Sequence, residues 1–287
     1  MPYITEFDPW KNRGCTCPPK YTLNPYTGCA HRCVYCYITS YIPEPFKLRY
    51  KRNLVRTVAK EVKKMDRDKY ISLSNSSDPY PPVESENCIT RNILKIFREN
   101  RFPVLIITKS DIVARDVDIL SEMDAVVTLT ITTVNDEIAK LLEPGAPPPS
   151  RRLKAIERLS EKVPCAVRID PIIPFINENV EEVVKEVAPF VRQCIFSTLK
   201  LRRDAFERII GAFPGLSEKL YRLYFKELKK IGNSYYLPHE LRKQIIQNAR
   251  EITRKYTLAF SSCREFMQEV NECACDGSSW FKNRGAK

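Results

Sequence analysis

Glycine and histidine are scarce in this sequence of 287 residues, and their scarcity excludes several familiar sites. There are eight glycines, and no two of them stand two residues apart, so neither the G-x-G-x-x-G dinucleotide fingerprint nor a P-loop occurs. There are two histidines, His31 and His239, which excludes zincin motifs, three-histidine zinc sites and two-histidine-one-carboxylate iron sites. Nucleotide binding by those two motifs and histidine-based metal chemistry are therefore not expected.

Long apolar runs are lacking as well. No stretch reaches the roughly 18 uncharged apolar residues that a membrane span needs, and the first six residues show no secretory pattern. We therefore expect a cytoplasmic protein without membrane contact. The net charge of +12 favours a polyanionic partner such as nucleic acid, although many basic intracellular proteins carry such charge without a specific partner.

Strands alternate with helices through the first two hundred residues. The run Val104-Leu105-Ile106-Ile107 is typical of a strand covered on both faces, and 54–64 has the apolar face of a helix. About six such repeats predict a parallel α/β sheet, either doubly wound or barrel-like. The expected strands are 21–24, 70–73, 104–107, 125–131, 166–169 and 194–197, and the expected helices are 54–64, 90–98, 113–123, 150–162, 180–190, 216–230 and 238–255.

Polar segments follow these strands, at the edge where parallel α/β folds gather functional groups. We expect three parts. Residues 1–20 form an N-terminal segment with a cysteine pair, and residues 21–202 form the core. Residues 203–287 form a helical extension with a cysteine-rich tail.

Cysteine is abundant, with eleven copies, and the strongest motif is a C-x3-C-x2-C run that follows the first strand. An odd number of cysteines without an export signal favours reduced, metal-binding thiolates. Three thiolates on one loop can each hold one iron of a 4Fe–4S cluster and leave the fourth iron open, whereas zinc sites usually pair ligands two and two. We therefore predict Cys29, Cys33 and Cys36 as cluster ligands and catalytic residues.

This run, with Tyr35 before its last cysteine, resembles the radical S-adenosylmethionine (radical SAM) superfamily. The flanks resemble its spore photoproduct lyase-like, or DNA repair photolyase-like, branch over roughly residues 15–200. The resemblance implies a partial (β/α)6 TIM-like barrel, here with the helical, cysteine-rich C-terminal extension. These flanks are Asn24-Pro25-Tyr26-Thr27-Gly28-Cys29, Ser76-Ser77-Asp78-Pro79-Tyr80, Thr108-Lys109-Ser110 and Asp170-Pro171-Ile172-Ile173-Pro174.

The resemblance also implies an enzyme with a 4Fe–4S cluster and S-adenosyl-L-methionine (SAM) as cofactors. One electron, from an external donor of the ferredoxin or flavodoxin type, cleaves SAM to a 5′-deoxyadenosyl radical that abstracts hydrogen from a substrate. Tyr35 is then a candidate to pack on the adenine of SAM. Residues 74–76 are candidates to hold the SAM amino group. Ordinary loop capping or ion pairing explains each of these residues equally well. The candidates at 74–76 are Ser74, Asn75 and Ser76. The candidates for binding the SAM carboxylate or a substrate phosphate are Lys109, Arg152 and Arg168.

One position differs from the pattern of the spore photoproduct lyase-like branch. Spore photoproduct lyases carry a hydrogen-donating cysteine where this sequence has Asn75, and Cys88 lies a dozen residues further on. This difference argues against the lyase reaction on a thymine dimer. The residues expected to generate the radical are unaffected by it.

Five further cysteines stand near the two ends of the chain. If both ends meet over the barrel mouth, four of these thiolates suit a second 4Fe–4S cluster or zinc, with one of each Cys-x-Cys pair as the ligand. Free thiols in a tail are the alternative. The five are Cys15, Cys17, Cys263, Cys273 and Cys275.

Aromatic and basic residues after the cysteine loop and after later strands can stack bases and neutralise phosphates, although a solvated basic face explains them too. We favour a radical SAM enzyme that acts on nucleic acid, by lesion repair or base modification. A radical SAM enzyme for a peptide or small metabolite, and a non-catalytic, metal-stabilised nucleic-acid-binding protein, stay open. The residues are Tyr41, Phe46, Arg49, Tyr50, Lys51, Arg52, Lys200, Arg202, Arg203, Tyr235 and Tyr236.

Overall fold

An eight-stranded sheet forms the centre of the molecule in a computed structural model that describes residues 2–7, 14–73, 75–226 and 230–282. The strand order is β1-β2-β5-β6-β7-β8-β9-β12, with antiparallel pairing only between β1 and β2. The two outer strands, β1 and β12, do not pair with each other in the described chain, so the barrel is partial and open. The bounds are Thr5–Glu6 (β1), Tyr21–Leu23 (β2), Ile71–Leu73 (β5), Val104–Thr108 (β6), Ala125–Thr130 (β7), Cys165–Ile172 (β8), Gln193–Thr198 (β9) and Ala259–Ser262 (β12).

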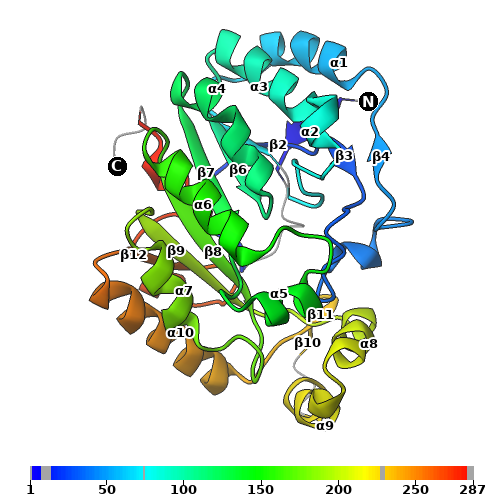
Figure 1. The fold of residues 1–287 in the computed structure, drawn as a ribbon, viewed down its shortest axis with the longest axis vertical. Coiled ribbons are helices and arrows are strands. Elements are labelled where there is room, and N and C mark those ends of the chain that lie inside the picture. The colour runs from blue at the N-terminus through cyan, green and yellow to red at the C-terminus, as the bar shows by residue number, and fades with distance from the viewer. Residues whose placement is uncertain (1, 8–13, 74, 227–229, 283–287) are drawn as a thin grey trace.

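Helices line the outer face of this sheet (Figure 1). Helix α3 buries Ile93, Leu94 and Phe97 on one face, as its spacing predicts, and α6 begins at Pro149, a residue suited to the first helical turn. No helix among the described residues combines the length and apolar character that crossing a membrane requires. The helices are Leu54–Glu61 (α1), Glu84–Asn87 (α2), Ile89–Glu99 (α3), Val117–Ser121 (α4), Asp136–Leu142 (α5), Pro149–Ser160 (α6), Val180–Val187 (α7), Arg203–Ala212 (α8), Ser217–Tyr221 (α9) and His239–Lys255 (α10).

Two short hairpins complete the fold. Strands β3 (Tyr26–Thr27) and β4 (Arg49–Tyr50) bracket the loop that carries the C-x3-C-x2-C run. Strands β10 (Lys230–Ile231) and β11 (Ser234–Tyr235) lie between α9 and α10. The hairpin of β3 and β4 therefore closes the base of the cysteine loop.

The predicted parallel α/β fold is confirmed, but several elements differ from the expected ones, and helices α2 and α5 were not predicted. The expected helix at 113–123 begins as a 3-10 turn from Asp111 to Asp116 before α4, and the one at 216–230 is α9 followed by a π turn, with residues 227–229 outside the described chain. Strand β12 was not predicted. Its four residues include two serines, and only the pairing with β9 makes them a strand.

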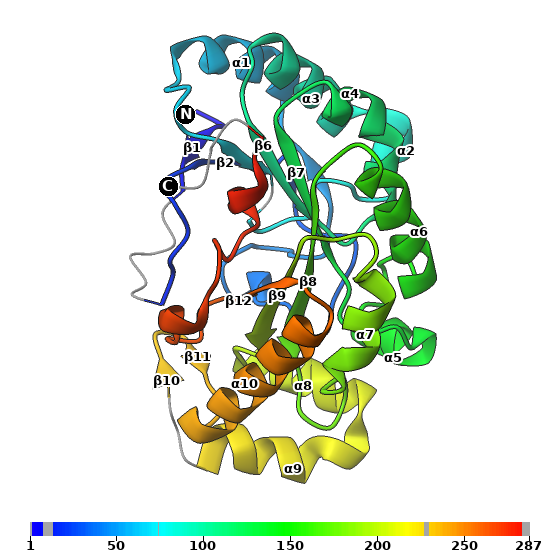
Figure 2. The ribbon, with the colours of Figure 1, turned by 90° about the vertical axis from the view of Figure 1, so that its left-hand side faces the viewer.

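The C-terminal tail fills the concave side of the sheet, opposite α4 and α6 (Figure 2). A side chain at Gly277 would meet the Thr128 hydroxyl at 2.8 Å, and its φ of +96° favours glycine. The Phe281 ring lies 5.1 Å from that of Tyr70. Asp276 forms a buried ion pair with Lys20 at 2.6 Å. The two ends of the chain therefore meet inside the partial barrel.

Candidate active site

A cavity of about 540 Å³ opens at the carboxyl edge of the sheet. Its wall is built from residues that end or follow successive strands, because the carboxyl ends of parallel strands meet at one edge. They include 75–78 after β5, Lys109 after β6, Arg168 and Asp170 in β8, Lys200 after β9 and Cys263 after β12, together with Cys29, Cys33 and Cys36.

The loop that carries these last three cysteines is fixed by two close backbone approaches. Gly28 has a φ of +79°, and a side chain there would meet the Lys47 carbonyl oxygen at 2.1 Å. A side chain at Gly145 would meet the Ala30 carbonyl oxygen at the same distance. Only glycine fits at either position, so two of the eight glycines hold this loop against its neighbours.

Hydrogen bonds also fix the loop that carries Cys29, Cys33 and Cys36. The Val34 amide donates to the Leu142 carbonyl at 2.9 Å. From α8, the Arg208 guanidinium donates to the carbonyls of Val34 and Cys36 at 3.0 and 2.9 Å. The loop is thus pre-organised with its three thiols on the cavity wall.

The donor set fits an iron–sulfur cluster. All eleven cysteines are free thiols, and burial raises the pKa of Cys33 while Lys109 opposes that rise. Within the described chain, no three His, Cys, Asp or Glu side chains surround a position for a single metal ion. A cubane needs no such position, because each thiolate binds an iron of its own.

Asp78 anchors the wall between two strands and the cysteine loop. It pairs with His31 at 3.1 Å, and accepts from the Thr108 hydroxyl at 2.7 Å and the Lys109 amide at 2.8 Å. Burial alone would raise the pKa of Asp78, but His31 and these hydrogen bonds outweigh it and lower the pKa to about 2. Asp78 is therefore an ionised anchor for the wall.

Glu143 organises a second buried group behind the wall. It accepts a hydrogen bond from the Tyr35 hydroxyl and forms a 2.5 Å ion pair with Arg152. The Lys109 ammonium lies 5.7 Å from the centre of the Tyr35 ring. Tyr35 and Lys109 line the cavity, whereas Arg152 is 1% exposed and stands behind Glu143. The structure thus brings Lys109 and Arg168, but not Arg152, to the cavity.

The cavity wall also carries an ion pair between Arg168 and Asp170. Arg168 pairs with Asp170 at 2.6 Å and also donates to the Cys275 carbonyl at 3.1 Å. Burial opposes ionisation of Asp170, but Arg168 and Lys200 lower its pKa. The cavity therefore holds fixed charges of both signs.

The segment after β5 presents small polar groups. Asn75 donates to the Thr22 hydroxyl at 2.5 Å, and the Ser76 hydroxyl donates to Asn24 at 3.0 Å. The Ser77 hydroxyl is buried in the cavity wall and has no hydrogen-bond partner among the described residues. Ser74 lies outside the described residues. An unpaired hydroxyl at this position suits a bound polar ligand.

Few of the aromatic and basic residues singled out from the sequence reach the cavity. Tyr41 and Lys200 line it. Arg49 instead donates to carbonyls of its own loop, at Pro43, Glu44 and Lys47. The sequence interpretation missed Tyr37 and Arg264, which also line the cavity. Their position directly after Cys36 and Cys263 was the signal that could have revealed them.

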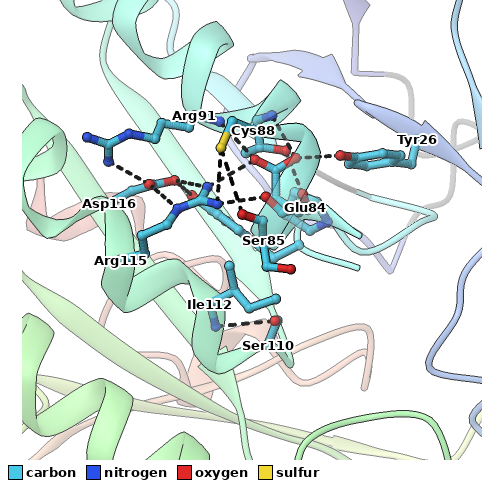
Figure 3. Close-up of polar contacts among 12 residues, drawn as sticks. Tyr26, Glu84, Ser85, Cys88, Arg91, Ser110, Ile112, Arg115 and Asp116 are labelled. Carbon is cyan, nitrogen blue, oxygen red and sulfur yellow. Dashed lines mark hydrogen bonds and ion pairs between the residues drawn. The ribbon is translucent and has the colours of Figure 1, made fainter. Parts of the chain in front are cut away.

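Cys88 lies elsewhere, in the helical layer outside the sheet (Figure 3). Its sulfur is 3.7 Å from the Arg115 guanidinium and 4.0 Å from the Ser85 carbonyl. It is not part of the cavity wall. The structure therefore gives Cys88 no place beside the cysteine loop.

Comparison with known families identifies this cavity-forming segment. Residues 23–187 match the family model of the radical SAM superfamily. An uncharacterized protein of Methanocaldococcus jannaschii, MJ0683, is 32% identical over 189 residues, which cover 64% of this chain and 71% of that protein. Rv2578c of Mycobacterium tuberculosis is 24% identical over 262 residues, covering 84% and 76%.

Solved structures share the fold. Spore photoproduct lyase complexed with dinucleoside spore photoproduct superposes with a TM-score of 0.63 and 16% identity, covering 84% of this chain and 75% of that one. Streptococcus suis SuiB bound to precursor peptide SuiA gives a TM-score of 0.57 and 12% identity, covering 84% and 48%. At these identities the likeness establishes the architecture alone.

Proposed function

This chain belongs to the radical SAM superfamily, and we propose that it is a radical SAM enzyme acting on nucleic acid, with its cluster held by Cys29, Cys33 and Cys36. The superfamily implies a 4Fe–4S cluster, SAM and an electron donor. With the cluster and SAM bound here, one electron from the external donor would cleave SAM to methionine and a 5′-deoxyadenosyl radical, which would abstract hydrogen from the substrate. The observation that carries the proposal is that these three thiols share one cavity with fixed charges and an unpaired hydroxyl.

The residues of the wall have separate tasks in this proposal. Lys109 and Arg168 neutralise the SAM carboxylate or a substrate phosphate, and the hydroxyls of Ser76 and Ser77 accept from the SAM amino group. The Tyr35 ring packs on the adenine. Arg152 acts through Glu143, which it holds against the Tyr35 hydroxyl, and is therefore a positioning residue.

The preference for nucleic acid rests on aromatic rings beside cations. Tyr37 and Tyr41 line the cavity with ring centres 6.1 Å apart, and they are 37% and 43% exposed. Lys200 and Arg264 lie in the same wall. Exposed rings stack on bases, and adjacent cations neutralise phosphates. Because Asn75 replaces a thiol at the end of β5, base modification or repair of a lesion other than the thymine dimer is the reaction we propose.

Anaerobic turnover tests the enzyme. Reconstituted protein with SAM and dithionite is expected to form 5′-deoxyadenosine, and Cys33→Ala is expected to form none. Cys194→Ala is a matched control, because Cys194 is a buried thiol of β9 outside the cavity wall. Equal product from both variants, or none from the wild type, would refute the enzyme proposal.

A binding titration tests the substrate. We expect single-stranded DNA or RNA to bind more tightly than a pool of peptides, and to lose affinity steeply as salt increases, because phosphate contacts release counterions. Peptide binding that is tighter and insensitive to salt would favour a peptide substrate instead.

A further inference from the structure

Four thiols from both ends of the chain converge beside the cysteine loop. The Cys17 thiol neighbours the thiols of Cys15 and Cys275. The Cys275 thiol also neighbours that of Cys263. Cys15, Cys17 and Cys263 line the same cavity as Cys29, Cys33 and Cys36. Four sulfurs that are remote in sequence therefore form a continuous group in space.

We propose that Cys15, Cys17, Cys263 and Cys275 bind a second 4Fe–4S cluster, separate from the one assigned to the three-cysteine loop. All four corners of this second cluster are ligated by protein, so no iron remains open for SAM or substrate. Its chemistry is therefore electron transfer or structural stabilisation. The inference goes beyond the proposed function and does not depend on the identity of the substrate.

The fold brings the four cysteines together by two devices. Strand β12 runs parallel to β9, which places Cys263 at the carboxyl edge, where its amide donates to the Phe196 carbonyl at 2.8 Å. The chain then returns through the concave side, where Arg168 holds the Cys275 carbonyl at 3.1 Å. The positions of Cys263 and Cys275 therefore follow from sheet pairing and from a buried side chain.

A buried ion pair locks the two ends of the chain to each other. Lys20, three residues after Cys17, pairs with Asp276, the residue after Cys275, at 2.6 Å. Both side chains are almost completely buried, and Asp276 also accepts from the Tyr70 hydroxyl. Breaking such a pair would leave an uncompensated buried charge. The cation of Lys20 also offsets the negative charge of nearby thiolates.

The structure reduces the five candidate cysteines to four. The Cys273 sulfur lies 4.0 Å from the Phe260 carbonyl, on the side of β12, whereas the Cys275 sulfur lies 3.5 Å from the hydroxyl of Thr16, the residue between Cys15 and Cys17. In the N-terminal pair, by contrast, both thiols belong to the group. Residues 15–17 are neither helix nor strand, so both sulfurs can reach one cluster. The expectation of one ligand from each Cys-x-Cys pair thus fits the C-terminal pair only.

The donor set favours a cluster over a single zinc ion. No three of these side chains in the described chain surround a position for one ion. A cubane places each thiolate on a separate iron and therefore needs a wider arrangement of sulfurs. The Thr16 hydroxyl lies 3.5 Å from the Cys275 sulfur, where it can hydrogen bond to a cluster ligand.

Iron and sulfide analysis of the full chain, reconstituted without oxygen, tests this assignment. We expect about eight irons per chain in the wild type and in Cys273→Ser, and about four in a double variant with alanine at Cys17 and Cys275, which keeps only two of the four thiols, because each cubane holds about four. The variant with alanine at Cys29, Cys33 and Cys36 is expected to keep about four irons. Its reduced cluster should give an electron paramagnetic resonance signal that SAM leaves unchanged.

The triple variant keeps the test decisive even if the double variant fails to fold. No iron in the triple variant, or about one zinc per chain that is lost in the double variant, would overturn the second cluster. Loss of SAM cleavage in the triple variant bears on the proposed function alone, so the two ideas fail separately.

Discussion

Two buried polar regions of this molecule differ in how completely their groups are paired. In the helical layer, Glu84 accepts from the Tyr26 hydroxyl and from the Thr90 amide at 3.0 Å, and pairs with Arg115 at 3.0 Å (Figure 3). Asp116 pairs with both Arg91 and Arg115 at 2.8 Å. In the cavity, the Ser77 hydroxyl has no partner in the described chain.

The difference separates a structural network from a binding site. A buried charge without partners is costly, so a fully paired network needs nothing from outside and stabilises the fold around it. A cavity with free thiols, an unpaired hydroxyl and cations beside aromatic rings leaves groups for a ligand to satisfy. The helical network also holds Tyr26, two residues before Gly28, and so supports the cysteine loop from behind.

The largest effect is expected from Glu84→Ala. Removal of the buried carboxylate leaves the Tyr26 hydroxyl and the Thr90 and Arg91 amides without their acceptor and takes one of two acidic partners from Arg115, which lowers the free energy of unfolding by about 3–5 kcal/mol. Anaerobic urea denaturation measures this change. A loss below about 1 kcal/mol would show that the network is less important to folding than its pairing indicates.

Lys109→Met tests the cavity, which is the second of the two regions compared. It should weaken SAM binding about thirtyfold, or about 2 kcal/mol, because a hydrogen bond to a charged group is lost. Equilibrium dialysis without oxygen measures the affinity, and Lys140→Met, on the exposed face of α5, is the control. Unchanged affinity in Lys109→Met would remove Lys109 from the SAM site.

Tyr41→Ala should affect substrate binding alone. Loss of one stacking ring is expected to weaken the binding of single-stranded nucleic acid by about 1 kcal/mol, or about fivefold. The affinity for SAM should stay unchanged. Fluorescence anisotropy gives the affinity. Tyr50→Ala is the matched control, since Tyr50 is 55% exposed and lies outside the cavity wall. Equal losses in both variants would point to a general surface effect.

The smallest effect is expected from Glu122→Gln. Glu122 pairs with Arg98 at 2.7 Å on the surface of the same helical layer, where its side chain is 62% exposed. Solvent screens such pairs, so the free energy of unfolding should fall by less than about 1 kcal/mol. A drop comparable to that of Glu84→Ala, under the same denaturation conditions, would mean that burial is not what distinguishes the network.

The parts of the fold that depend on local pattern were predictable. The apolar run of β6 and the faces of α1 and α3 appear where their spacing placed them. The spacing of Cys29, Cys33 and Cys36 likewise put three thiols on one loop after a strand. Arg152 was different, because helical position does not tell whether a cation faces a cavity or a buried carboxylate such as Glu143.

The sequence by itself determined an alternating α/β chain with a three-cysteine loop, since both features are encoded within short windows. Tertiary structure alone decided which distant groups meet. Strand β12 exists because β9 pairs with it, and Cys275 rather than Cys273 joins Cys17 because the tail turns into the concave side of the sheet. Contacts between opposite ends of a chain depend on how the whole sheet curves, which no local pattern specifies.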